Sequence, residues 1–413
     1  MLTKCLCGLI CIFAISIFSM AVPALTQSPS QTTNLPRVFS LNPQALVEVR
    51  ERLRQKDPAL EPALQSLIAQ ANDDLTIKPL SVMDKPKAGP SGDKHDYVSY
   101  ADYYWPNPKT PNGLPYVRRD GYYNHAAIDG GDSPHFQKIV PAVYRLALAY
   151  WFTGNATYSQ QAGKLLRVWF LDPATRMNPN MKAAQLVLGD NTIRGEGLIE
   201  FRWMFLLVDA LGLLNGAPGW SDQDAAQMHA WLEAYDTWLD SSPNAKAERS
   251  AANNHGTWIN VQEAALLLYL GKTDQAQAIF LHDQTKRIPG QIKPDGEQPL
   301  EQVRNEGLSY CLFNLNAQTD LANLARSAGV DLWHFKTKDG AGIQPALDYI
   351  LPYAFYEKHW PRSQRAKIDP ENLIPLLLEA QNAYGKEGYA DYLAKIPQDQ
   401  VQANIVNLYF LPQ

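Results

Sequence analysis

The sequence is poor in cysteine and has no excess of positive charge. Three of its four cysteines, Cys5, Cys7 and Cys11, lie near the start, and only Cys311 follows them. No internal disulfide is therefore expected beyond the first residues, and burial of a core must stabilise this chain of 413 residues. The 37 Lys and Arg against 42 Asp and Glu give a net charge of −5, which disfavours non-specific nucleic-acid binding.

Motifs for metals, phosphates and serine nucleophiles are also missing. The sequence has no HExxH, no CxxC pair, no glycine-rich phosphate loop and no GxSxG elbow. Its histidines are scattered, although His95, His125 and His135 share one region and leave a three-histidine metal site open. We therefore predict no metal and no cofactor.

The first 24 residues have the pattern of a secretory signal peptide. Lys4 precedes an apolar run over residues 9–18, and Ala21 and Ala24 offer small residues for cleavage. The run is shorter than the roughly 20 residues that span a bilayer. We predict an exported protein, periplasmic or secreted, with a polar linker over 25–40 and one domain over 41–413. After cleavage no membrane association is expected, and the oligomeric state is left open.

Helical periodicity dominates the remainder, and alternating strand patterns are scarce. Consecutive helices suggest hairpins, and the lack of a fixed sequence repeat favours a closed α/α toroid over an open solenoid. We predict an all-α fold, an incomplete barrel of about six or seven hairpins, with a long irregular loop region over 76–133. The expected helices cover about 43–55, 59–72, 135–152, 156–170, 195–214, 222–239, 256–270, 273–284, 300–328, 344–357, 371–384 and 388–395.

Two segments combine residue types that suit acid–base chemistry. Asn254 and His255 stand at the start of a predicted helix, where the dipole favours an anion; alternatively they cap the helix and pack against it. Arg304 and Tyr310 lie six positions apart, and a break near Gly307 would bring them together. Glu301, three residues before Arg304, is expected to pair with it.

Together these groups fit β-elimination on a uronic acid. Asn254 and Arg304 suit neutralisation of the carboxylate beside the weakly acidic C5 proton. His255 and Tyr310 suit removal of that proton and protonation of the departing O4, and a nearby arginine would favour the phenolate of Tyr310.

Other residues indicate a cleft for an acidic glycan, although salt-bridged loops and core aromatics explain them equally well. These residues are Arg118, Arg119 and Arg194, together with an aromatic-rich stretch over 97–105. Hydrolysis by two carboxylates remains an alternative, with Asp132, Glu196 and Glu306 as candidates.

The sequence resembles the alginate lyase superfamily of polysaccharide lyases. The resemblance rests on YVSYADYYWPNPKTPNGLPYVRRDG (97–121), the segment 149–185, NNHGTWINVQ (253–262) and PDGEQPLEQVRNEGLSYCLFNL (294–315). It departs from the family pattern after Gly121 and at Arg194-Gly195-Glu196-Gly197.

The resemblance implies an α/α toroid that cleaves alginate or a related β-1,4-linked uronan such as glucuronan by β-elimination. Asn254 and Arg304 would neutralise the carboxylate, Tyr310 would act as acid and for one stereochemistry as base, and His255 would act as base or neutralising partner. The alternatives are a toroidal glycoside hydrolase and a non-catalytic binder of acidic glycans. The predicted partner is an anionic polysaccharide, bound by Tyr103, Tyr104, Trp105, Arg118, Arg119, Gln185, Arg194, Asn253 and Trp258.

Overall fold

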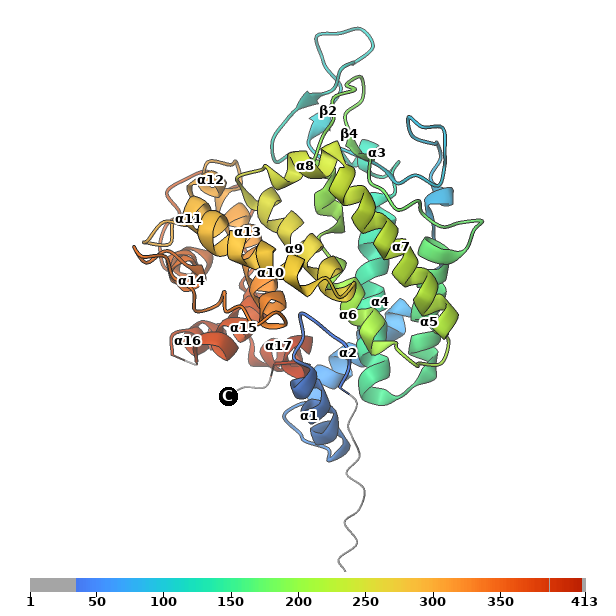
Figure 1. The fold of residues 1–413 in the computed structure, drawn as a ribbon. Coiled ribbons are helices and arrows are strands. Elements are labelled where there is room, and N and C mark those ends of the chain that lie inside the picture. The colour runs from blue at the N-terminus through green and yellow to red at the C-terminus, as the bar shows by residue number, and fades with distance from the viewer. Residues whose placement is uncertain (1–34, 386, 411–413) are drawn as a thin grey trace, which may run out of the picture. The chain divides into compact units, whose positions relative to one another are not determined.

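The computed structural model describes residues 35–385 and 387–410, and helices make up most of them (Figure 1). The all-α class is thus confirmed. The predicted signal peptide and residues 25–34 of the predicted linker lie outside the described residues. The α-helices are α1 (Pro43–Arg54), α2 (Glu61–Asp74), α3 (His125–Ile128), α4 (Ser133–Thr153), α5 (Ala156–Leu166), α6 (Met204–Leu213), α7 (Asp222–Ser241), α8 (Pro243–Arg249), α9 (Asn254–Tyr269), α10 (Thr273–His282), α11 (Ile288–Gln291), α12 (Pro299–Gln302), α13 (Gly307–Arg326), α14 (Ile343–Ala354), α15 (Ile374–Tyr384), α16 (Tyr389–Leu393) and α17 (Gln398–Ala403).

Short 3₁₀ and π segments join or extend these helices. The 3₁₀ segments are η1 (Val82–Asp84), η3 (Glu196–Phe201), η5 (Pro370–Leu373) and η6 (Ile405–Leu408), and the π segments are η2 (Arg167–Leu171) and η4 (Asp283–Arg287).

An inner ring of helices surrounds the core. Along this ring α2 packs on α4, α4 on α6, α6 on α9, α9 on α13, and α13 on α15. The C-terminal α17 and η6 return to α2 and close the ring. Helix α9 is buried on nearly all sides, as expected for an inner helix, whereas α7 and α10 leave one face exposed (Figure 1). The predicted α/α toroid is confirmed.

Two of the predicted helices are interrupted. The segment predicted as 195–214 divides into η3 and α6, and 300–328 divides into α12 and α13. At the first, η3 ends at Phe201 and α6 begins at Met204, so Arg202 and Trp203 separate them. At the second, the Gly307 N–H donates to the Ser363 carbonyl at 3.0 Å instead of to its own helix. Helices α8 and α17 were not predicted, because they are too short for a clear period.

The long loop region carries short strands that the sequence did not indicate. β1 (Val98–Tyr100) pairs in parallel with β4 (Ala183–Leu186), and β2 (Tyr104–Trp105) pairs antiparallel with β3 (Val117–Arg118). Strands of two to four residues are too short for alternation to be detected. They give the loop a defined backbone above the ring.

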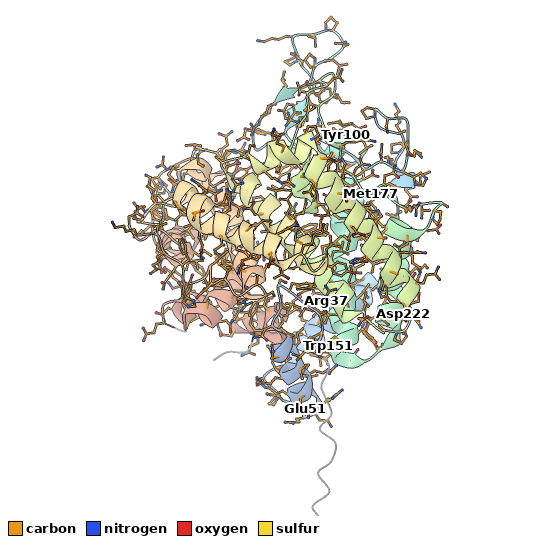
Figure 2. All side chains as sticks on the ribbon, viewed as in Figure 1. Arg37, Glu51, Tyr100, Trp151, Met177 and Asp222 are labelled. Carbon is orange, nitrogen blue, oxygen red and sulfur yellow. The ribbon has the colours of Figure 1, made fainter. Side chains whose placement is uncertain are left out.

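Aromatic side chains pack together between the loop region and the inner helices. Phe136 of α4 and Phe201 of η3 stack with their ring centroids 4.0 Å apart, and Tyr97 packs edge-on against both. Trp151, labelled in Figure 2, donates from its indole N–H to the Leu46 carbonyl of α1 at 3.4 Å. Among the described helices none is long and apolar enough to cross a membrane.

The end of the predicted linker packs on the ring. The backbone N–H groups of Phe39 and Ser40 donate to the buried carboxylate of Asp209 on α6, at 2.6 and 3.1 Å. The division into linker and single domain stays a prediction.

A buried ion pair fixes the loop region to α4. Lys85 Nζ lies 3.1 Å from Asp132 Oδ2, and both side chains are fully buried. The ammonium group also donates to the carbonyls of Val82 and Lys94 at 2.5 and 2.6 Å, and Asp132 accepts the Val98 N–H at 2.8 Å. The pair therefore ties both ends of the loop region together.

Replacing Lys85 by alanine is expected to lower the free energy of unfolding by about 3–5 kcal/mol, because it leaves a buried carboxylate without its counter-charge. Denaturant unfolding measures this. The matched control is Lys182→Ala: its partner Asp96 is 2.8 Å away, but Lys182 is half exposed, so a loss below about 1 kcal/mol is expected. Equal losses in the two variants would contradict the anchoring role of Lys85.

Candidate active site

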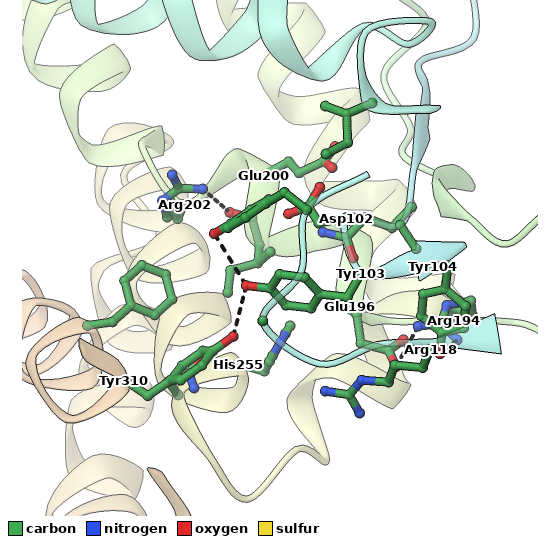
Figure 3. A pocket seen from close by; sticks show the side chains of 18 of the residues that line it. Asp102, Tyr103, Tyr104, Arg118, Arg194, Glu196, Glu200, Arg202, His255 and Tyr310 are labelled. Carbon is green, nitrogen blue, oxygen red and sulfur yellow. Dashed lines mark hydrogen bonds and ion pairs between the residues drawn. The ribbon is translucent and has the colours of Figure 1, made fainter. Parts of the chain in front are cut away.

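A cavity of about 1100 Å³ opens where the inner helices begin. α4, η3, α9 and α13 each contribute residues from their first two turns, including Pro134, Ile199, Asn254 and Tyr310. The N-terminal ends of helices carry partial positive charge, so their convergence favours an anionic ligand. The loop region supplies the opposite wall through residues 101–104 and Arg118 (Figure 3).

The cavity brings together the two segments singled out in the sequence. Asn254, His255, Arg304 and Tyr310 all line it. In Figure 3 the hydroxyl of Tyr310 points toward that of Tyr103, with the His255 ring nearby.

Asn254 is held by a carboxylate from α12. Its backbone N–H and its side-chain Nδ2 each donate to Glu301, at 2.7 Å. The predicted pairing of Glu301 with Arg304 is therefore wrong, because the start of α9 occupies both oxygens of Glu301. The buried Oδ1 of Asn254 has no hydrogen-bond partner among the described residues. An amide carries two N–H bonds, so one of them remains for a ligand.

His255 faces the cavity with its imidazole held from behind. Nδ1 lies 2.6 Å from Oε1 of Glu248, whose side chain is 2 % exposed. Burial by itself lowers the pKa of His255, but the negative charges of Glu248, Glu196 and Glu301 outweigh it and raise the pKa above the usual value. No described residue bonds to Nε2.

Arg304 and Tyr310 are in direct contact, and the helix break before Gly307 allows them to meet, as predicted. Arg304 Nη2 donates to the Tyr310 hydroxyl at 2.8 Å, and the guanidinium carbon lies 3.8 Å from the centre of the phenol ring. Asp120 accepts from Nη2 and Nε of Arg304 at 2.7 and 3.2 Å, and from Arg118 at 2.7 Å. One carboxylate thus orients two cations, and Nη1 of Arg304 has no partner in the described part of the chain.

Burial raises the pKa of Tyr310 above its usual value, although the hydrogen bond from Tyr103 and the charge of Arg304 both act to lower it. Arg304 thus favours the phenolate, as expected from the sequence, but burial outweighs it, and Tyr310 is protonated at neutral pH. The Tyr103 oxygen lies 2.9 Å from the Tyr310 oxygen and 3.3 Å from the Tyr123 oxygen, and its single proton bonds to one of the two at a time.

The predicted binding residues divide into two groups. Tyr103, Tyr104, Arg118, Gln185, Arg194 and Asn253 line the cavity.

The other three, Trp105, Arg119 and Trp258, have no place in the cavity wall. Trp105 donates to the Tyr122 carbonyl and lies under the guanidinium of Arg119. Trp258 is buried and packs on Phe313 at 5.0 Å. Sequence position alone did not reveal which side of the strand or helix these residues occupy.

Arg194 and Gln185 are held in the wall by specific contacts. Arg194 lies over the Tyr104 ring at 5.1 Å and pairs with Glu196 at 3.1 Å. Gln185 has a φ of +50°, an uncommon left-handed backbone for a residue other than glycine. Its N–H donates to the Ser99 hydroxyl at 2.7 Å, which holds it in this conformation.

The three carboxylates considered for glycoside hydrolysis all form ion pairs with basic side chains. Asp132 belongs to the buried pair with Lys85 and does not line the cavity. Glu196 pairs with Arg194, and Glu306 pairs with Arg365 at 2.7 Å.

The three-histidine metal site that the sequence left as a possibility is not formed by His95, His125 and His135. His95 bonds to the Arg176 carbonyl at 2.6 Å, while His125 stacks on Tyr123 and lines the cavity. No group of three metal-ligating side chains that would hold a metal ion occurs among residues 35–385 and 387–410.

Several cavity residues were not singled out in the sequence. Glu248 belongs to the unpredicted helix α8, and Tyr123 and Arg202 lie just beyond the motifs. Asp120, which holds Arg304 from beside the cavity, was not singled out either, since Arg304 is 184 positions away. Ser242 and Pro243, a cap and a first-turn proline, mark the start of α8 in the sequence but do not single out Glu248.

Comparisons with known proteins identify the family of this chain. A family model described as alginate lyase matches residues 81–360. A crystallised alginate lyase from Bacteroides ovatus is 34% identical, with a TM-score of 0.85 over 92% of this chain and 100% of that chain. Alginate lyase A1-III from Sphingomonas species A1 is 17% identical, with a TM-score of 0.60 over 92% of this chain and 98% of that chain, and shares the fold.

A variant of A1-III complexed with a tetrasaccharide is 15% identical, with a TM-score of 0.59 over 93% of this chain and 98% of that chain. The search of curated proteins gives no match. The family model covers more than half of the chain, and the Bacteroides ovatus enzyme matches it nearly end to end. This chain therefore belongs to the alginate lyase family of polysaccharide lyases.

Proposed function

We propose that this enzyme cleaves alginate or a closely related β-1,4-linked uronan by β-elimination. The observation that carries the proposal is the convergence of Asn254, His255, Arg304 and Tyr310 in one cavity. The likeness to crystallised alginate lyases, one of them with a tetrasaccharide, supports the choice of substrate class.

In this mechanism the carboxylate of the sugar is neutralised first. Arg304 presents Nη1 while Asp120 and Tyr310 fix its other nitrogens. Asn254 presents its second amide hydrogen while Glu301 fixes the first. Donors held in place before binding stabilise the enediolate that develops when the C5 proton leaves.

Two groups then move protons. Tyr310 is protonated at rest and donates its proton to the departing O4. The resulting phenolate is stabilised by Arg304 and Tyr103, which both contact its oxygen. His255 takes the C5 proton through Nε2 or helps to neutralise the carboxylate. For the opposite stereochemistry at C5, Tyr310 first loses its proton to solvent, and its phenolate then takes the C5 proton and passes it to O4.

A substrate panel tests this function. The purified enzyme is incubated with polymannuronate, polyguluronate, alginate and glucuronan, and near-ultraviolet absorbance is followed. Elimination creates a C4–C5 double bond conjugated with the carboxylate, so absorbance must rise with at least one uronan. New reducing ends without absorbance would indicate hydrolysis, and binding without products would indicate a glycan-binding protein; either result would contradict the proposal.

We also propose that the enzyme is exported, on the basis of the signal-peptide pattern in its first 24 residues. N-terminal sequencing of the protein recovered from the periplasm or medium tests this. Recovery in the cytoplasm with Lys4 still present would contradict it.

A further inference from the structure

Glu248 is a buried carboxylate in the cavity wall, directly beside His255. It lies in the last turn of α8, and its side chain is 2 % exposed. Oε1 is 2.6 Å from Nδ1 of His255, and no lysine or arginine in the described part of the chain forms a salt bridge with it. A carboxylate buried at this depth is costly unless it is hydrogen-bonded, so the contact with His255 is its main compensation.

The corner between α8 and α9 is held rigidly, which fixes the position of both partners. Arg287 donates to the backbone carbonyls of Ala251 and, at 2.7 Å, of Arg249. Gln291 donates to the next two carbonyls, those of Ala252 and Asn253, at 2.9 and 3.0 Å. Four backbone carbonyls within residues 249–253, shortly before His255, are thus hydrogen-bonded by side chains of η4 and α11.

A second contact secures α8 from the cavity side. Asn244 donates to the Arg194 carbonyl at 2.6 Å, and Gly195 lies against the backbone of Glu248. The carboxylate therefore has little freedom to move away from the imidazole.

We propose that Glu248 is a positioning residue that holds His255 with Nδ1 toward α8 and Nε2 toward the substrate. An ionised carboxylate only accepts hydrogen bonds, so Nδ1 must carry the proton. In the neutral ring the lone pair then lies on Nε2, the nitrogen that faces the cavity. The inference rests on the proposed function, since His255 must act on a uronate for its orientation to matter.

The charged groups around His255 also act on its imidazole ring. Three carboxylates face His255: Glu248 from α8, Glu196 from η3 and Glu301 from α12. Arg194 partly offsets Glu196, Arg304 partly offsets Glu301, and Arg287 acts on Glu248 from η4. Only Glu248 touches the ring, so it has the largest influence on which form of the imidazole is present.

The test compares two variants of Glu248 with a matched control. Glu248→Gln keeps the shape and removes the charge, and Glu248→Ala removes the contact. Glu196→Gln removes a carboxylate that faces His255 without touching it. The ¹⁵N spectrum of His255, assigned by its loss in His255→Gln, is titrated in each folded protein without substrate, and the pH profile of uronan cleavage is measured in parallel.

We expect Glu248→Gln to lower the pKa of His255 by about one unit and to mix its two tautomers, with a smaller change in Glu196→Gln. The limb of the pH–rate profile that follows His255 should move to lower pH, and kcat should fall roughly 10- to 100-fold with little change in KM.

An unchanged tautomer and pKa of His255 in both Glu248 variants would overturn the inference, whatever the activity. Spectral changes without any change in the pH profile or kcat would also overturn it, because positioning would then not affect the reaction. A wild-type enzyme that cleaves no uronan would contradict the proposed function instead, and the substrate-free spectra would still decide whether Glu248 orients the ring.

Discussion

Replacing Tyr310 by phenylalanine is expected to lower kcat by about 10²- to 10⁴-fold while KM changes little. The variant removes the proton that the proposed mechanism delivers to O4. It keeps the ring over which the Arg304 guanidinium lies at 3.8 Å, so the cavity wall should retain its shape. Initial rates of near-ultraviolet absorbance, with substrate binding measured by calorimetry, separate catalysis from affinity.

The matched control for this variant is Tyr356→Phe. Tyr356 is 57% exposed, donates to the Ile368 carbonyl at 2.7 Å and does not line the cavity. Its loss should leave both constants within about twofold, as is usual for an exposed site. Rates near those of the wild type for Tyr310→Phe would remove Tyr310 from the mechanism.

Replacing His255 by alanine is expected to reduce kcat/KM by a similar factor, about 10²- to 10⁴-fold. In either proposed role, the ring acts next to the C5 proton or the carboxylate of the same sugar. Unlike Tyr310→Phe, this variant should also weaken binding where the imidazolium contributes charge. Steady-state rates across a pH series measure both effects.

Loss of the imidazole also leaves Glu248 buried without a partner, which costs roughly 1–3 kcal/mol of stability. His255→Gln serves as the second variant, because its amide can still donate to Glu248. His359→Ala, at an exposed histidine away from the cavity, is the surface control. A folded His255→Gln enzyme with normal rates would show that the imidazole has no chemical role.

The parts of the fold that could be predicted are those with strong local signals. Long amphipathic segments such as α4 and α7 begin and end within about two residues of their predicted bounds. The break between η3 and α6 was not predicted, and the break before Gly307 was harder to place, because there the Gly307 N–H bonds to Ser363, which is distant in sequence.

In the candidate site, too, residues with a local sequence signal could be predicted and residues placed by distant contacts could not. Asn254, His255, Arg304 and Tyr310 were found because their residue types at a helix start and a helix break suit one reaction. Their immediate partners were not found.

Glu301, expected to pair with Arg304, instead binds Asn254 across 47 positions, and Asp120 reaches Arg304 across 184. Such pairings are set by how the ring closes, and no local pattern encodes them. The effect of Arg304 on the pKa of Tyr310 was predicted in the right direction, but the larger opposing effect of burial is tertiary and has no local signal.

A crystal structure of the Tyr310→Phe enzyme with a bound uronate tetrasaccharide is the most direct test of the convergent site. One sugar carboxylate should lie within hydrogen-bond distance of Arg304 and Asn254, with C5 of that sugar facing Nε2 of His255 and O4 next to the ring at position 310. An oligosaccharide bound elsewhere, or one whose carboxylate points away from both donors, would contradict the assignment.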